Sequence, residues 1–245
     1  MRVALIGASG FVGARVLDEA LLRKHPVTAI VRHPERLTQR PGLQARKIDV
    51  FQFDRMVEGL RGHDVLISAY NPGHDLSVNP HLYKEVVEGT VSIIRATKAA
   101  RVPHLIYIGG AGSLHAGPDL RVVDDPGFPS RYSIHVPSAL QVFATQKTMS
   151  IDIPLSGRTA ALLFEHDHTF SWSFISPPLF MEPGVRSGRY ALGSDQFPWD
   201  GDRPAGISIE DLAVAVLDEC ESPRHIHQHF TVTRDRSADS AAPTM

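Results

Sequence analysis

The chain has 245 residues, a length typical of one large α/β domain or two small ones. Hydrophobic residues make up 42% and charged residues 21%, which is typical of a protein with an ordinary apolar core. The net charge of −2 gives no electrostatic case for binding nucleic acid or an anionic membrane, and no apolar run is long enough to span a bilayer. The single cysteine, Cys220, excludes an internal disulfide framework and fits a reducing compartment, so we expect a cytoplasmic protein.

The N-terminus combines a short apolar run, a glycine turn and a helical pattern. The run from Met1 to Ile6 reads as a buried strand rather than a signal peptide, and a helical pattern begins at Ala14. Between them, the first glycine of the turn lets the chain leave the strand sharply, the second lets the backbone approach a pyrophosphate, and the third lets the helix pack on the strand. The turn therefore predicts a dinucleotide site, with a turn that binds no ligand as the alternative. It reads Gly7-Ala8-Ser9-Gly10-Phe11-Val12-Gly13.

Apolar strand-like runs alternate with amphipathic helical patterns along the rest of the chain. This alternation predicts a Rossmann-like, doubly wound parallel sheet with helices on both faces. We expect one domain over residues 1–233, with substrate-side elements over about 113–206 and a disordered tail over 234–245. The expected helices are 12–24, 52–61 and 80–100, and the expected later strands are 27–31, 44–48, 64–69, 104–108 and 172–176.

Ligands of such sheets bind at the carboxyl ends of the strands, so the residues that follow each strand are the candidate site. Besides the glycine turn, they are Arg32-His33, Asp49-Val50, Ala69-Tyr70-Asn71, Gly109 to Ser113, and Ser176-Pro177-Pro178.

The end of the second strand indicates which nicotinamide cofactor is bound. An acidic residue there would bind the adenosine 2′-hydroxyl, but the first charged residue is Arg32, and Arg36 lies one helical turn further on. A guanidinium pairs with a phosphate through two hydrogen bonds, which favours NADP(H) over NAD(H). The alternative is that Arg32 is a solvated surface charge. Asp49 and Val50 would flank the adenine, the first as a hydrogen-bond acceptor and the second as an apolar contact.

The chain resembles the atypical short-chain dehydrogenase/reductases, specifically their NADH-flavin reductase-like, NAD(P)-binding members. The resemblance covers roughly residues 1–130 and 168–232. It implies a small-molecule substrate and hydride transfer from a nicotinamide to a flavin (FMN or FAD), a quinone or another conjugated acceptor. The residues that carry it are the glycine turn, Ala29 to Arg32, Asp64 to Gly73, Gly109 to Leu114, Trp172 to Pro178, Glu182-Pro183-Gly184, Gly188-Arg189-Tyr190 and Ile207 to Ala213.

The resemblance fades between about Ser133 and His168, where related proteins are expected to have one helix. Pro137 can begin a helix, but we expect Pro154 to end or break one. This segment is expected near the substrate. Either it forms an unusual lid, or its sequence is locally scrambled relative to that of related proteins. The sequence alone does not separate these two alternatives.

The larger superfamily uses a Tyr with a Lys four residues on, because the Lys lowers the pKa of the phenol. None of the tyrosines in this chain has that Lys, which disfavours ordinary carbonyl reduction and favours an acceptor that needs no strong enzymatic acid. The catalytic candidates are Ser113, where the superfamily places a substrate-orienting Ser, and Tyr132, near the expected position of the Tyr. A turn or capping role is the alternative for Ser113. Tyr70 and Asn71 are expected to line the nicotinamide pocket, and Gly109 and Gly110 to adjoin it. Apolar residues that could wall an aromatic substrate are Phe180, Met181 and Trp199.

The thirteen histidines raise the question of a metal site. His225, His227 and His229 alternate, so they would share one face of a strand, as His166 and His168 would on another. No Cys or carboxylate completes a familiar ligand spacing, so we expect an exposed strand face and no metal.

The sequence thus predicts an NAD(P)H-dependent oxidoreductase, for which a homodimer is allowed. Two alternatives stay open. One is a non-catalytic sensor that reads the NADP state, which the missing Tyr-Lys pair favours. The other is a dedicated biosynthetic reductase or isomerase, which the divergent segment favours.

Overall fold

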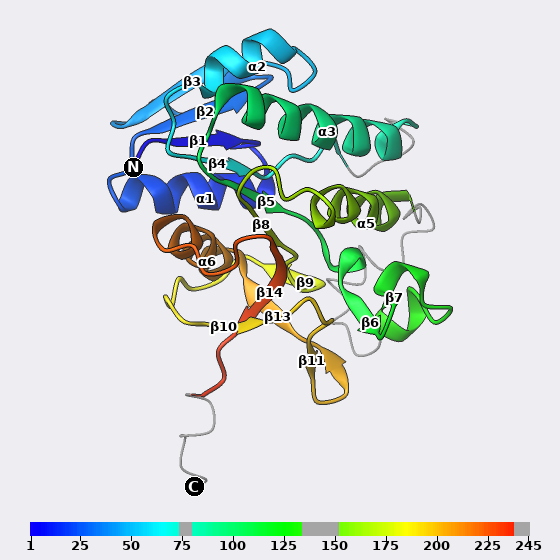
Figure 1. Cartoon of the computed structure of the whole chain (residues 1–245). Helices are drawn as coiled ribbons and strands as arrows, with labels where there is room; N and C mark the ends of the chain where they lie inside the picture. The colour runs from blue at the N-terminus through cyan, green and yellow to red at the C-terminus, as the bar shows by residue number, and fades with distance from the viewer. Residues whose placement is uncertain (74–79, 134–151, 238–245) are drawn as a thin grey trace, which may run out of the picture.

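The computed structural model of the chain describes residues 1–73, 80–133 and 152–237. Its centre is an eight-stranded sheet in the order β10-β14-β8-β5-β4-β1-β2-β3 (Figure 1). The strands are β1 (Val3–Ile6), β2 (Val27–Val31), β3 (Leu43–Lys47), β4 (Val65–Ser68), β5 (Leu105–Ile108), β8 (Trp172–Ile175), β10 (Tyr190–Gly193) and β14 (Gln228–Arg234).

The sheet confirms the predicted Rossmann-like architecture. From β3 to β14 all neighbouring strands are parallel, with Val3 opposite Val27 on one side and opposite Val65 on the other. Because the chain moves outward from β1 in one direction and from β4 in the other, the order of strands reverses between these two. This reversal is the place where doubly wound sheets bind their ligands.

The expectation of a wholly parallel sheet is corrected at one edge. β10 pairs antiparallel with β14, with Tyr190 opposite Arg234; β10 was not among the strands expected from the sequence, and β14 begins at Gln228, inside the stretch where the alternating histidines indicated a strand. In the middle of β14, Phe230, Thr231 and Val232 are buried, while β10 is half-exposed. An antiparallel edge strand on an otherwise parallel sheet is common in this architecture.

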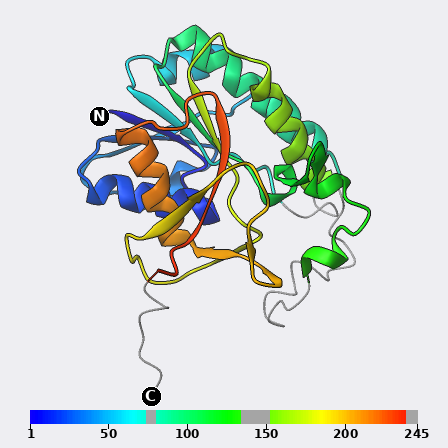
Figure 2. The ribbon, with the colours of Figure 1, turned by 60° about the horizontal axis from the view of Figure 1, so that its bottom comes forward.

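Helices cover both faces of the sheet, as predicted (Figures 1 and 2). One face packs on two helices that also contact each other, and the other face packs on a row of three helices. The first pair is α1 (Phe11–Leu22) and α6 (Ile209–Glu221), and the row is α2 (Phe53–Leu60), α3 (Leu82–Ala100) and α5 (Asp152–Glu165). The two apolar cores lie between these layers, and burial of their aliphatic side chains is the main stabilising term. Among the described residues, no helix is long and apolar enough to cross a membrane.

Short elements project beyond the sheet on the side where its strands end. Two of them pair in parallel, β9 (Phe180–Glu182) with β13 (Gly206–Ser208). The remaining elements are β6 (His115–Gly117), β7 (Leu120–Arg121), β11 (Trp199–Asp200), β12 (Arg203–Pro204), and the 3-10 turns η1 (Pro34–Arg36), η2 (Ala111–Ser113), η3 (Val122–Asp124) and η4 (Ser130–Ser133).

The divergent segment is helical where the structure describes it, which corrects the expectation for Pro154. Residues 134–151, with Pro137, lie outside the described residues. α5 begins at Asp152, so Pro154 falls in its first turn, where backbone N–H groups have no partner within the helix and a proline costs little. Pro154 also packs on the backbone of Gly112, where a Cβ would come within 2.6 Å of the proline ring.

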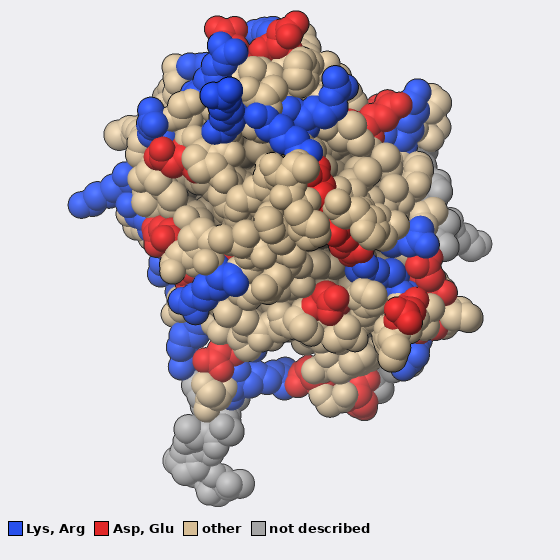
Figure 3. All heavy atoms as spheres, in the orientation of Figure 1, with Lys and Arg blue, Asp and Glu red and all other residues tan. Residues whose placement is uncertain are grey.

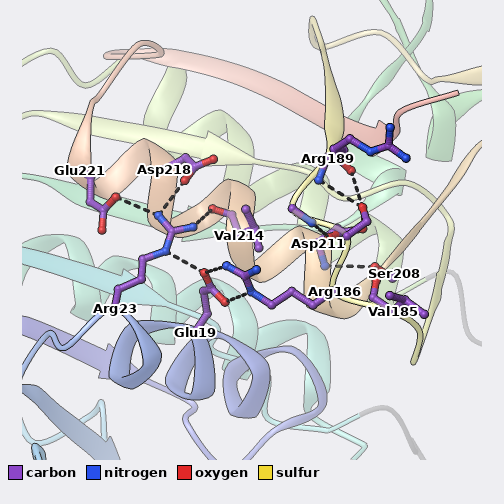
Figure 4. A network of polar contacts seen from close by, with 12 residues as sticks. Glu19, Arg23, Val185, Arg186, Arg189, Ser208, Asp211, Val214, Asp218 and Glu221 are labelled. Atoms are coloured by element: carbon purple, nitrogen blue, oxygen red, sulfur yellow. Dashed lines mark hydrogen bonds and ion pairs between the residues drawn. The ribbon is translucent and has the colours of Figure 1, made fainter. Parts of the chain in front are cut away.

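A network of charges joins α1 to α6 and to the loop that follows β9 (Figure 4). Glu19 is buried, and its carboxylate accepts hydrogen bonds from Arg23 at 2.7 Å and from Arg186 at 2.6 and 2.7 Å. Arg23 donates in turn to Asp218 at 2.7 Å and Glu221 at 2.9 Å on α6. Elsewhere on the face seen in Figure 1, Lys and Arg side chains gather toward the end formed by β3 and α2 (Figure 3).

Two expectations near the C-terminus are corrected. Of the three alternating histidines, only His229 belongs to β14, because the chain turns at His227 with a φ of 56°. His229 is largely buried. The histidines therefore share no exposed strand face: His225 pairs with Glu219 at 2.8 Å, while His227 Nε2 lies 2.8 Å from a backbone carbonyl oxygen. In addition, residue 234, expected to begin the tail, is the last residue of β14.

Candidate functional site

A cavity of about 600 Å³ opens at the carboxyl ends of β1, β2, β4 and β5. It lies at the reversal of strand order, where the topology predicts a ligand. Of the expected cofactor-binding residues, Ala8 is buried beneath the cavity and the others line it. Those that line it are Gly7, Ser9, Gly10, Phe11, Val12, Arg32, Asp49, Val50, Ala69, Tyr70, Asn71, Gly109 and Gly110.

The glycine turn is closed so tightly that side chains are excluded at two positions. Gly7 has a φ of +80°, and a Cβ there would lie 2.3 Å from the carbonyl oxygen of Ala69. A Cβ on Gly13 would lie 2.1 Å from the carbonyl oxygen of Gly7. Gly10 precedes α1, and no side chain caps this helix, so the first N–H groups of α1 face the cavity without a capping side chain. Such a turn suits a pyrophosphate, because backbone donors and the helix dipole both favour negative charge.

Two arginines and a histidine line the cavity beyond β2. Arg32, His33 and Arg36 all border it, and the 3-10 turn η1 brings Arg36 back toward the strand end. His33 Nδ1 lies 2.9 Å from a carboxylate oxygen of Glu35, which turns that acidic group toward the histidine. Arg32 and Arg36 form the positively charged end of the cavity.

The loop after β3 lies next to this cationic end. The Asp49 carboxylate accepts a hydrogen bond from the backbone N–H of Phe51 at 3.0 Å, which fixes the turn into α2. Val50 is buried, and its carbonyl accepts a hydrogen bond from Ser92 of α3. Phe51 is exposed and also lines the cavity, a contact that the sequence analysis did not name.

The Tyr70 ring forms part of the wall between β4 and α3. It lies where Gly89 of α3 has no side chain, since a Cβ there would come within 2.4 Å of the ring. The hydroxyl points to the backbone carbonyl of Glu85 at 3.4 Å, and burial raises the pKa of Tyr70 well above its ordinary value. Tyr70 is therefore placed as a neutral residue of the cavity wall.

Two glycines after β5 form the wall at the other end of the cavity. A Cβ on Gly109 would lie 2.3 Å from the Phe174 ring, so this residue must stay small for packing. A Cβ on Gly110 would meet no atom of the described residues within 4 Å, so this residue borders open space. Ser113 lies directly behind this wall: it is fully buried, and its hydroxyl oxygen is 2.7 Å from the Gly110 carbonyl oxygen.

Tyr132 is placed away from the cavity. It belongs to a separate aromatic cluster with Phe197 and Trp199, and its hydroxyl donates to Asp125 at 2.6 Å. Burial and the Asp125 carboxylate both raise the pKa of Tyr132. Of the apolar residues expected to wall a substrate, Met181 lines the cavity, whereas Trp199 and Phe180 are not among the described lining residues.

One helix face that lines the cavity was not foreseen from the sequence. Ser156, Gly157 and Ala160 of α5 line the cavity opposite the glycine turn, and Leu82 and Val86 of α3 adjoin them. The signal was the recurrence of small residues at helical spacing, which the proline at the start of the helix concealed. These small side chains leave room for a bulky ligand between α5 and the sheet.

The fold and this site define an NAD(P)-binding protein of the Rossmann type. A family described as NAD(P)H-binding matches residues 7–223, and the chain belongs to that family.

Individual relatives agree with this membership. The uncharacterized protein YwnB of Bacillus subtilis is 32% identical over 240 residues, which cover 96% of this chain and 99% of YwnB. The solved structure of a protein of Bacteroides thetaiotaomicron, provisionally called an epimerase, has a TM-score of 0.77 and 35% identity, over 95% of this chain and 96% of that one. An L-arabinose 1-dehydrogenase (NAD(P)(+)) of Haloferax volcanii is 35% identical over 107 residues, 43% of this chain and 39% of that enzyme.

Proposed function

We propose that the protein is an NADPH-dependent oxidoreductase that reduces a planar, conjugated small molecule such as a flavin or a quinone. The observation that carries the proposal is that one continuous cavity joins the two parts of the site. It runs from the cationic end at Arg32, past the glycine turn, to the open wall at Gly110 and the small residues of α5. The cavity therefore offers a site for phosphate groups next to a site for a bulky apolar ligand, and hydride transfer between two rings requires that both be held close together.

The residues present fit a dinucleotide. The turn from Gly7 to Val12 would hold the pyrophosphate, and Arg32 with Arg36 would pair with a 2′-phosphate. Asp49 and Val50 would contact the adenine. The nicotinamide would lie in the remaining part of the cavity, bordered by Ala69, Tyr70, Asn71, Gly109 and Gly110.

When bound, NADPH supplies a hydride, and the reduced acceptor also takes up a proton from solvent. The chain's own part is to orient the acceptor and to exclude water from it. The tyrosine hydroxyls described above are poor acids, because the pKa of Tyr70 and that of Tyr132 are both raised. We therefore assign Tyr132 a packing role and propose that Ser113, whose hydroxyl donates to the Gly110 carbonyl, holds the wall at the acceptor end from behind. An acceptor that needs no strong acid fits this arrangement best.

Binding and turnover test the proposal separately. NADPH and NADH are titrated by protein fluorescence, and NADPH oxidation is then followed by absorbance with FMN, FAD and a series of quinones. We expect tighter binding of NADPH than of NADH and turnover with at least one acceptor. Tight NADPH binding without turnover over the whole series would refute the enzymatic proposal and favour the sensor. Turnover confined to one ligand that co-purifies with the protein would favour the dedicated enzyme.

A further inference from the structure

A chain of buried polar side chains lies behind the Gly110 wall. Ser113 Oγ lies 2.7 Å from Ser176 Oγ, which lies 2.8 Å from Nε2 of His229. On the other side of the imidazole ring, Nδ1 of His229 lies 3.4 Å from Nη1 of Arg121. These residues come from η2, the end of β8, β14 and β7, so segments far apart in sequence meet here.

Each group of the chain is withdrawn from water. Ser113 and Ser176 are fully buried, and the His229 side chain is 5% exposed. Arg121 is largely buried, donates to the backbone carbonyl of Ser113 at 2.6 Å and pairs with Glu165 at the end of α5, which compensates its charge. Buried polar groups are costly unless every member is bonded, so a fully bonded chain in this position is a defined arrangement rather than a chance contact.

The chemistry of arginine fixes the direction of the chain. A guanidinium only donates, so Nδ1 of His229 must accept from Arg121, and the ring proton must lie on Nε2. Nε2–H then donates to Ser176, Ser176 donates to Ser113, and Ser113 is left as the last donor. In this structure Ser113 donates to the carbonyl oxygen of Gly110, on the cavity wall.

The charged groups around His229 are consistent with a neutral ring. Burial and the Arg121 charge lower the pKa of His229 to about 3, while Asp195 opposes and His115 adds to this effect. Glu165 is 4.0 Å from Nδ1, beyond hydrogen-bond distance. The imidazole therefore stays neutral at physiological pH and transmits polarisation rather than a net charge.

We propose that Arg121, His229 and Ser176 are positioning residues that hold the Ser113 hydroxyl on the Gly110 carbonyl oxygen and so fix the wall at the acceptor end of the cavity. The proposal rests on the proposed function. Because the Ser113 oxygen accepts from Ser176, its O–H donates more strongly to the Gly110 carbonyl, which fixes the wall against which the acceptor would be oriented for hydride transfer. No proton transfer through His229 is required, because the chain acts by hydrogen bonding and the proton comes from solvent.

Nitrogen-15 NMR of histidine-labelled protein tests the direction of the chain without any turnover. We expect a neutral His229 with a protonated Nε2 and an unprotonated Nδ1 at neutral pH, and a shift of the Nε2 signal in Ser176→Ala. A proton on Nδ1, or an imidazolium, would overturn the proposal. Assignment uses His229→Gln, in which the His229 signals are absent.

Kinetics test the consequence. We expect Ser176→Ala and His229→Leu to lower kcat for the acceptor by about tenfold, less than the roughly hundredfold loss for a donor in direct contact. The Kd of NADPH should stay unchanged. His229→Gln, whose amide can donate from a similar position, should recover most of the loss. The matched controls are Ser173→Ala, which removes another buried hydroxyl of β8, and His227→Gln; both should keep the wild-type kcat.

The outcomes separate this proposal from the function on which it rests. Wild-type kcat in a folded His229→Leu protein, or equal losses in the Leu and Gln variants, would overturn the role of the chain. If His229→Leu does not fold, Ser176→Ala alone decides. If the wild-type protein binds NADPH but reduces no acceptor, the proposed function fails, and the NMR result still supports or overturns the hydrogen-bond direction.

Discussion

Two neighbouring glycines should respond to the same substitution in opposite ways. Gly110 has φ −151° and ψ 160°, an extended conformation that any residue adopts, and a Cβ there meets nothing within 4 Å among the described residues. Gly110→Ala should therefore fold normally, with a free energy of unfolding within about 0.5 kcal/mol of wild type. Gly109→Ala should be destabilised by about 1–3 kcal/mol, since its methyl group would overlap the Phe174 ring at 2.3 Å.

The functional effect should be the reverse. If the cofactor and acceptor fill the space in front of Gly110, the added methyl group overlaps a fitted ring and costs about 1–3 kcal/mol of binding. This corresponds to a weakening of roughly 5- to 150-fold in the Kd of NADPH or the KM of the acceptor. Urea unfolding and fluorescence titration measure the two quantities. A stable Gly110→Ala protein with unchanged Kd and KM would refute the assignment of this wall to the ligand.

Three further substitutions test other parts of the structure. Arg32→Ser should weaken NADPH binding by roughly 10- to 150-fold, the worth of a charged hydrogen bond of about 1.5–3 kcal/mol, and leave NADH binding unchanged; equal effects on both would contradict a 2′-phosphate contact. Gly7→Ala should lose cofactor binding and about 1–2 kcal/mol of stability from its positive φ alone, measured by titration and urea unfolding. Glu19→Ala should lower the free energy of unfolding by about 3 kcal/mol, toward the lower end of the loss expected when one partner of a buried ion pair is removed. The loss is limited because Arg186 can reach solvent and Arg23 keeps its ion pairs with Asp218 and Glu221 (Figure 4). Hydrogen bonding to Arg186 lowers the pKa of Glu19 in the folded protein. The contribution of Glu19 to the free energy of unfolding is therefore fully present above the pKa of the unfolded state and is lost as pH falls through the pKa of the folded state. The difference in stability between wild type and variant should narrow in acid, and a difference that stays constant would contradict this origin.

The cofactor half of the site could be predicted from the sequence because its signals are local. The strand, glycine turn and helix around Gly7 occupy consecutive residues, and each later strand end is marked by an apolar run that stops. Parallel topology then brings Arg32, Val50 and Asn71 to one edge without any knowledge of side-chain contacts. The residues expected from that rule line the cavity, with Ala8 beneath it.

The proposed acceptor half could not be predicted in the same way, because its contacts join distant segments. Ser113 meets Ser176 and His229, which lie 63 and 116 residues away, and no local pattern records such a meeting. The histidine alternation suggested an exposed strand face, but the turn at His227 removes that face. At Pro154, propensity indicated a break, whereas its place in the first turn of α5 makes it compatible with the helix.

The two halves of the site face different physical requirements, which explains this difference. A phosphate is recognised by backbone amides and one or two cations, so a short glycine-rich segment with a nearby arginine is enough. A hydride acceptor needs a wall held at a defined position in a dry environment, and the proposed wall at Gly110 is held from behind by the Ser113 hydroxyl. In the usual Tyr-Lys arrangement a cation acts on the donor directly. Here Arg121 lies behind the cavity wall: it donates to the backbone carbonyl of Ser113 at 2.6 Å, and it is linked to the Ser113 hydroxyl through His229 and Ser176. On this reasoning, neutral His229 is a connector whose replacement should change kcat without changing cofactor affinity.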